Sequence, residues 1–133
     1  MGKRIAMLGA GAIGSSVGAD LTEAGYDITI IDQWPAQVEA MRQQGLRIVM
    51  PDREVRTRVR ALDLCDLARV DPRFDIVLMA VKSYDTRWLA QLIKPFLAPD
   101  GWFVGVQNSM NDETNASIVG REKGSVVLMC GCR

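Results

Sequence analysis

The chain has 133 residues, 48% hydrophobic and 24% charged, and its 16 Lys and Arg residues balance 16 Asp and Glu residues. This length suits a single domain, residues 1–133, and the composition is typical of a soluble globular protein. With zero net charge and no apolar run approaching the roughly 18 residues of a membrane span, we expect neither nucleic acid nor a membrane as a partner. The three cysteines lack a framework spacing and there is no histidine, which indicates free thiols, a cytoplasmic protein and no metal site.

The first predicted element is a short apolar strand at residues 5–8, followed at once by a glycine-rich turn. The turn reads G-A-G-A-I-G, and apolar residues at helical spacing then predict a helix from about Ala12 to Ala24. In a strand–turn–helix setting the first glycine allows the tight turn, the second the close approach of a pyrophosphate, and the third close helix packing. The residues predicted to bind a dinucleotide are therefore Gly9, Ala10, Gly11, Ala12, Ile13 and Gly14. The alternative is a glycine-rich turn with no ligand.

The next predicted strand covers residues 28–31 and is followed directly by Asp32. An acidic residue about twenty positions after the glycines stands where a ribose-binding carboxylate is found. Such a carboxylate accepts hydrogen bonds from a free ribose 2′-hydroxyl and repels a 2′-phosphate, so Asp32 favours NADH over NADPH. The alternative is an ordinary helix-capping or solvated acid.

The middle of the chain predicts a helix, a strand and a hairpin. Pro35 opens the helix and Gly45 ends it. Residues 46–50 are expected to form the third strand, and the alternating stretch 54–59 to pair with it as a hairpin. Basic residues alternate with Val and Thr in this stretch, which indicates a strand with one wet face rather than a nucleic-acid patch. Residues 62–70 are ambiguous, with a short helix around Asp66 preferred.

The second half of the chain continues the alternation of strands and helices. Residues 74–81 form the clearest strand, whose apolar residues on both faces indicate a covered parallel sheet. The elements expected after it are a helix from about Asp85 to Phe96 with Trp88 in the core, a turn at 99–101, a strand at 102–106, a helix ending at Val119 and a sixth strand at 125–129. This order predicts an α/β fold: a Rossmann-type, doubly wound parallel sheet in a single domain.

Ligands of such sheets lie off the carboxyl ends of the strands. Lys82 comes directly after the most buried predicted strand, and the amides of Gln107, Asn108 and Asn111 come after the fifth. An ammonium can hold a phosphate, a ribose hydroxyl or a substrate carboxylate, and an amide can hold a nicotinamide ribose or a substrate oxygen. The alternatives are a solvated lysine for Lys82 and a turn-capping amide for Asn108.

Three motifs stand in the same order as in a known family: G-A-G-A-I-G at 9–14, V-K-S-Y-D-T at 81–86 and Q-N-S-M-N at 107–111. With them the chain resembles the N-terminal nucleotide-binding domain of ketopantoate reductase (2-dehydropantoate 2-reductase). The resemblance implies an NAD(P)H-dependent oxidoreductase that reduces a 2-oxo acid, 2-dehydropantoate, to pantoate in pantothenate and coenzyme A biosynthesis. It also implies that Lys82 and Asn108 are the catalytic residues of this domain: Lys82 contacts the cofactor, and Asn108 lies between nicotinamide ribose and substrate.

Two departures from the family keep alternatives open. Ser109 stands where the family often has glycine, so another small oxo or hydroxy acid is an alternative substrate. Asp32 stands where NADPH-using members commonly have arginine, so the family favours NADPH and the residue favours NADH. A non-catalytic NAD(H)-sensing module is an alternative from another class.

The resemblance further implies a helical C-terminal domain, absent from these 133 residues, that carries the general-acid lysine. A carbonyl reduction needs a proton donor as well as a hydride donor. We therefore expect this chain to bind the cofactor without turning over alone. A missing domain leaves an apolar surface exposed, and a homodimer is one arrangement that would cover it.

Overall fold

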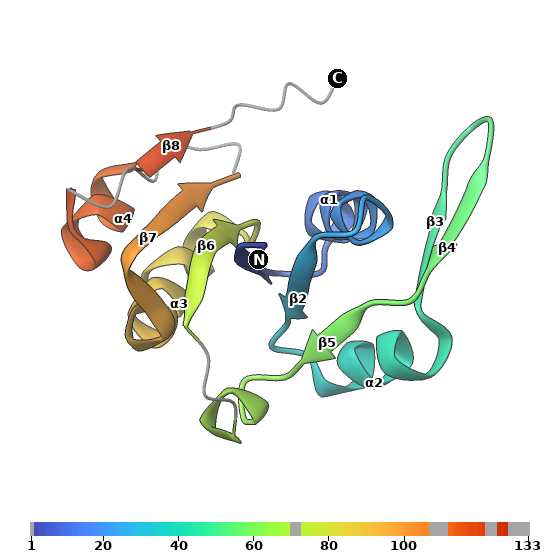
Figure 1. The fold of residues 1–133 in the computed structure, drawn as a ribbon, viewed down its shortest axis with the longest axis horizontal. Helices are drawn as coiled ribbons and strands as arrows, with labels where there is room; N and C mark the ends of the chain where they lie inside the picture. Colours follow the sequence, from blue (N-terminus) through green and yellow to red (C-terminus); the bar gives the residue numbers. More distant parts are fainter. Residues whose placement is uncertain (1, 70–72, 107–111, 122–124, 128–133) are drawn as a thin grey trace.

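The computed structural model describes residues 2–69, 73–106, 112–121 and 125–127 (Figure 1). Six strands form one parallel sheet in the spatial order β5-β2-β1-β6-β7-β8. In that order they are Arg60–Leu62, Asp27–Ile31, Arg4–Leu8, Phe74–Met79, Leu97–Gly105 and Ser125–Val127. The chain builds outward from β1 to β5, returns to place β6 beside β1, and then builds outward to β8. The predicted doubly wound, Rossmann-type α/β sheet is confirmed.

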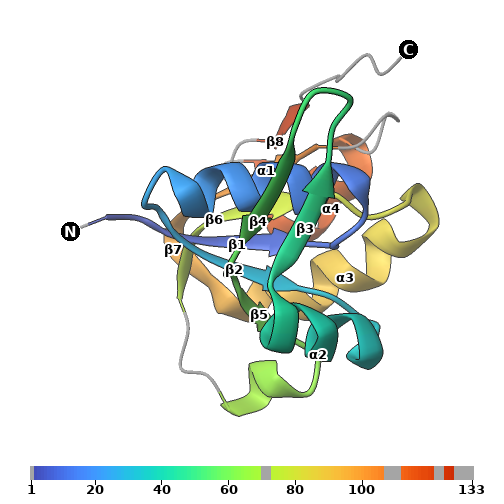
Figure 2. The same cartoon turned by 90° about the vertical axis from the view of Figure 1, so that its right-hand side faces the viewer.

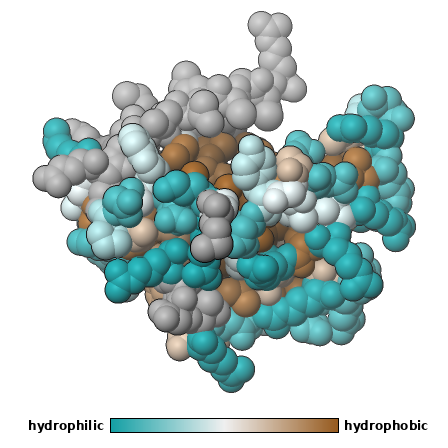
Figure 3. All heavy atoms as spheres, in the orientation of Figure 1, coloured by the Kyte–Doolittle hydropathy of each residue, from teal (hydrophilic) through white to brown (hydrophobic). Residues whose placement is uncertain are grey.

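Helices cover both faces of this sheet (Figures 1 and 2). One face carries α1 (Ala12–Glu23) and α2 (Pro35–Gln44), and the other carries α3 (Thr86–Ile93) and α4 (Asp112–Val119). Because successive side chains of a strand point to opposite faces, β1 contributes to both cores. Ile5 and Met7 pack with α1 and α2, and Ala6 and Leu8 pack with α3 and α4. In the face shown in Figure 3, hydrophobic residues appear near the middle of the view, and many hydrophilic residues lie around them.

The third strand of the sheet is not the one expected from the sequence. The residues predicted for that place form β3 (Leu46–Val49), which pairs antiparallel with β4 (Glu54–Thr57) outside the main sheet. The place beside β2 is taken by β5 instead. The predicted hairpin itself is confirmed, and Figure 2 shows it running from the end of α2 across α1 and beyond it. Only alternate residues of this hairpin are turned toward the protein, as a two-stranded ribbon with one wet face requires.

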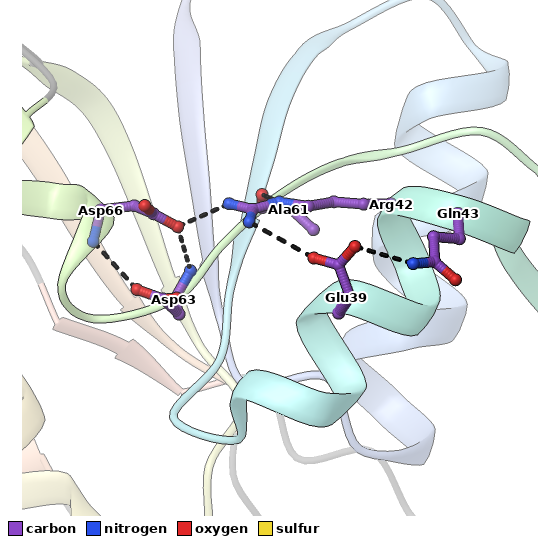
Figure 4. Close-up of polar contacts among 6 residues, drawn as sticks. All are labelled: Glu39, Arg42, Gln43, Ala61, Asp63 and Asp66. Atoms are coloured by element: carbon purple, nitrogen blue, oxygen red, sulfur yellow. Dashed lines mark hydrogen bonds and ion pairs between the residues drawn. The ribbon is translucent and has the colours of Figure 1, made fainter.

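An arginine of α2 anchors the short strand β5 at the edge of the sheet (Figure 4). Arg42 donates to the carbonyl oxygen of Ala61 at 3.0 Å and pairs with Asp66 at 2.5 Å. Asp63 and Asp66 each accept the backbone N–H of the other, which orders the turn after β5. The hydrogen bond to Arg42 lowers the pKa of Asp66 below its ordinary value. The short helix predicted around Asp66 is confirmed as a 3₁₀ helix, Asp66–Arg69.

The other boundaries follow the predicted pattern with local shifts. A 3₁₀ turn, Ser83–Asp85, precedes α3, and a second one, Lys94–Phe96, follows it. β7 begins at Leu97, before the predicted turn, but its pairing with β6 shifts register between Phe74 and Ile76 and becomes regular only from Trp102. No helix in the described part of the chain is long and apolar enough to cross a membrane.

The solvent-exposed face of the hairpin carries a cluster of ion pairs. Arg47 and Arg56 both donate to the Glu54 carboxylate, and these hydrogen bonds lower its pKa from 4.5 to about 2. A lowered pKa in the folded state stabilises the fold above pH 4.5, and that contribution is lost as the pH falls toward 2. We expect an NMR titration of the Glu54 carboxyl group to give a midpoint near 2, and Arg47→Ala to raise it. A midpoint at the ordinary glutamate value in the unmodified chain would contradict the cluster. The Glu54 side chain is exposed at the surface, so added salt should weaken the effect.

Candidate functional site

The candidate site lies at the carboxyl ends of the central strands. Backbone hydrogen bonds continue past the strands and tie these ends together: Gly9 N–H to Ile31 O and Ala80 N–H to Leu8 O, both 2.8 Å. β1 and β6 are neighbours at the point where the strand order reverses, which is where open α/β sheets bind their ligands. This edge brings together the glycine turn, Asp32 and Lys82.

The glycine turn has the backbone that its sequence requires. Gly9 has a φ of 98°, in the left-handed region, and a Cβ there would lie 2.9 Å from the Val81 side chain. A Cβ on Gly14 would overlap the Gly9 carbonyl oxygen, so this glycine allows α1 to pack directly on the turn. At Gly11, a Cβ would meet no atom of the described residues within 4 Å. The first and third glycines are therefore needed by the fold, and the second faces open space.

The open space in front of Gly11 is bordered by the N-terminus of α1. Gly11 is the N-cap of this helix, no side chain caps it, and its first turn has no acidic residue. The N–H groups of a helix's first turn have no partner within the helix and carry its positive dipole end. These uncapped donors, beside a position with room for a ligand, fit a phosphate group.

Asp32 lies against the glycine turn and is 7% exposed. Its Oδ2 accepts the Ala10 N–H at 2.8 Å, and its Oδ1 accepts the Trp34 N–H at 2.9 Å, at the start of α2. Asp32 thus orders both the glycine turn and the entry to α2. A carboxylate oxygen has two lone pairs, so each oxygen retains one for a further hydrogen bond.

A second carboxylate, that of Asp85, lies at the same edge of the sheet and is linked to the end of β2 through Gln33. Asp85, in the segment between β6 and α3, accepts a hydrogen bond from the Trp88 indole at 2.8 Å and one from the Gln33 amide at 3.4 Å. Trp88 is 37% exposed, so its predicted place in the core is wrong. Its indole N–H needs a polar partner, and Asp85 supplies one at the surface. Asp85 belongs to the V-K-S-Y-D-T motif that the sequence singles out at 81–86, whereas Gln33, next to Asp32, was missed as a site residue.

Lys82 is exposed at the end of β6, at the edge that also carries the glycine turn. Asn108 and Ser109 lie outside the described residues, as do the neighbouring amides Gln107 and Asn111. The role expected for Asn108, between nicotinamide ribose and substrate, therefore stays a prediction. Within the described ranges, no three His, Cys, Asp or Glu side chains are grouped to hold a metal ion.

The parallel sheet and the glycine turn at the strand-order reversal define a Rossmann-type α/β domain. Comparison with known proteins identifies the family: the model described as "Ketopantoate reductase PanE/ApbA" matches residues 5–132, and the chain belongs to that family. The resemblance seen in the sequence motifs is confirmed.

Individual relatives agree with this assignment. The 2-dehydropantoate 2-reductase of Pyrococcus horikoshii is 31% identical over 124 residues, which are 92% of this chain and 39% of the relative. The structure of a PanE/ApbA family ketopantoate reductase from Ralstonia eutropha JMP134 matches with a TM-score of 0.78 and 31% identity, over 93% of this chain and 39% of that one. D-mandelate dehydrogenase with NADH and anilino(oxo)acetate matches with a TM-score of 0.83 at 22% identity, over 93% and 39%, and so shares the fold. The chain spans about 40% of the length of these proteins.

Proposed function

We propose that residues 1–133 are the NAD(P)H-binding domain of a reductase that converts 2-dehydropantoate to pantoate, a step of pantothenate and coenzyme A biosynthesis. Membership of the ketopantoate reductase family supports the reaction. The observation that carries cofactor binding is the glycine turn, where uncapped helix N–H groups border the space in front of Gly11. Turnover of 2-dehydropantoate by the native full-length protein, compared with other small 2-oxo acids, tests the substrate.

Each candidate residue has a chemical role in this proposal. The residues Gly9, Ala10, Gly11, Ala12, Ile13 and Gly14 form the loop that holds the pyrophosphate. Its donors are the backbone N–H groups from Gly11 onward, because those of Gly9 and Ala10 donate to Ile31 and Asp32. Asp32 accepts hydrogen bonds from the adenosine ribose. Lys82 and Asn108 orient the nicotinamide ribose and the oxo acid, and the Lys82 ammonium suits the substrate carboxylate. The bound nicotinamide supplies a hydride, and the alcohol product also needs a proton from an acid.

We further propose NADH rather than NADPH as the cofactor. Asp32 is joined at this edge by Asp85, which a Gln33 hydrogen bond links to the end of β2. A 2′-phosphate at the adenosine ribose would meet two carboxylates, and the repulsion costs binding free energy. A free 2′-hydroxyl would instead donate to the remaining lone pair of an Asp32 oxygen.

Calorimetric titration with both nucleotides tests this preference. We expect NADH to bind about tenfold more tightly than NADPH. Asp32→Asn should reduce this difference between the two affinities, because it removes one negative charge. Asparagine keeps one acceptor for the backbone of the turn, whereas alanine would leave two N–H groups without their partner. Asp20→Asn, an exposed change on α1, is the matched control for charge and should leave the difference unchanged. Equal or tighter NADPH binding by the unmodified chain would refute the NADH assignment.

A further inference from the structure

Three side chains from different segments hold the backbone of Ala10, in the middle of the glycine turn. Asp32 Oδ2 accepts the Ala10 N–H at 2.8 Å. The carbonyl oxygen of Ala10 accepts two hydrogen bonds, from Gln37 Nε2 at 2.7 Å and from Ser15 Oγ at 2.8 Å. The Ala10 methyl group is buried, so the residue is restrained at its side chain as well as at both of its backbone polar groups.

The restraint on the Ala10 carbonyl also sets the direction of the next N–H group. A trans peptide is planar, and its C=O and N–H point in opposite directions. Because the Ala10 carbonyl points toward Gln37 and Ser15, the N–H of Gly11 points away from them. No residue of the described ranges accepts this Gly11 N–H, and a Cβ on Gly11 would meet nothing within 4 Å. The donor therefore faces the open space where the pyrophosphate is proposed to lie.

Gln37 lies in a more distant element than Ser15 and Asp32, the other two residues that bind the Ala10 backbone. Ser15 is in α1, which follows the turn directly, and Asp32 follows β2, which pairs with β1. Gln37 lies in the first turn of α2 and reaches back over 27 residues of sequence to the glycine turn. Its side chain is exposed, so core packing does not explain its position.

We propose that Gln37 is a positioning residue for dinucleotide binding: by holding the Ala10 carbonyl, it keeps the Gly11 N–H aimed at the pyrophosphate. This inference rests on the proposed function, since it takes the ligand to be a dinucleotide. The proposal predicts different effects on binding of the diphosphate and of the adenosine. Contacts to the diphosphate depend on the direction of the Gly11 N–H, whereas contacts to adenosine alone do not.

Titration of Gln37→Met with NADH, ADP and adenosine tests the proposal. Methionine keeps the length of the side chain and removes the amide donor. We expect NADH and ADP to bind roughly five- to tenfold more weakly, the effect of one lost hydrogen bond, and adenosine to bind as before. Gln43→Met is the matched control, because Gln43 is on the same helix and donates to Glu39 at 2.9 Å, away from the turn. This control should bind all three ligands like the unmodified chain.

Each outcome bears on a different claim. Unchanged NADH and ADP affinity in Gln37→Met would overturn the role of Gln37 and leave the proposed function standing. A weakening that includes adenosine to the same extent would also overturn it, because it would indicate general damage to the fold. If the unmodified chain bound neither NADH nor ADP, the proposed function would fail, and the role of Gln37 would fail with it.

Discussion

Gly14→Ala is expected to destabilise the domain by about 3 kcal/mol or more, the upper range for adding atoms to a packed site. The added Cβ would overlap the Gly9 carbonyl oxygen, which is backbone and cannot rotate away. Gly9 itself is held by a 2.8 Å hydrogen bond to Ile31 O and cannot yield without disturbing the pairing of β1 with β2. Against a typical total stability of about 5–15 kcal/mol, a change of this size lowers the urea midpoint strongly or prevents folding.

Gly11→Ala is the control for this prediction, since it makes the same chemical change where the described part of the chain places no atom within 4 Å of the added Cβ. We expect its free energy of unfolding to stay within about 0.5 kcal/mol of that of the unmodified chain, so that the two urea midpoints lie close together. Its affinity for NADH should fall, because the new methyl group occupies the approach of the pyrophosphate. Similar urea midpoints for the two alanine variants would mean that α1 does not pack on the glycine turn as described.

Asn115→Leu is expected to stabilise the domain by about 1–3 kcal/mol, the cost of burying an amide without partners. Asn115 is 1% exposed on α4, and neither its Oδ1 nor its Nδ2 has a hydrogen-bond partner among the described residues. It is one helical turn from Val119, which belongs to the core formed by α3 and α4. Leucine has the same branched shape and carries no polar atoms. We expect the thermal midpoint to rise by roughly 5–10 °C.

Ser117→Leu separates burial from helix propensity in this experiment. It introduces the same residue two positions away on the exposed side of α4, where the gain should be a few tenths of a kcal/mol. A lower midpoint for Asn115→Leu would show that the amide makes a stabilising contact, and the expected gain would then be wrong.

The fold was largely predictable because most of its elements have strong local signals. The buried runs of β1 and β6, the glycine turn and the proline at the start of α2 each determine a local structure on their own. The third sheet strand was not predictable in this way. The sequence of β3, LRIV, has the better strand composition, but β5, with the sequence RAL, lies beside β2. There Ala61 is buried, and Arg42 donates a hydrogen bond to its carbonyl oxygen. Partners from other elements outweigh local propensity in such short strands.

The site was predictable to the extent that its residues share a motif. The glycines and Asp32 follow from spacing along the chain. The contacts of Gln37 with Ala10 and of Gln33 with Asp85 join segments 27 and 52 residues apart, so only the folded sheet brings them together. The hydrogen bond from Ala10 to Asp32 likewise gives that residue a structural role that the motif alone does not indicate.

The central place of β1 has a consequence for folding during synthesis on the ribosome. β1 emerges first and can pair with β2 soon afterwards, through Ile5 and Ile28, but its other neighbour, β6, is made only after the hairpin and β5. Ala80 and Val81, which adjoin Gly9, arrive with β6. The residues that pack against the glycine turn from β6 therefore arrive late, and a nascent chain that ends before β6 cannot yet form the complete proposed nucleotide site. Under the proposed function, binding of the nucleotide should thus begin only after the second half of the sheet has joined the first.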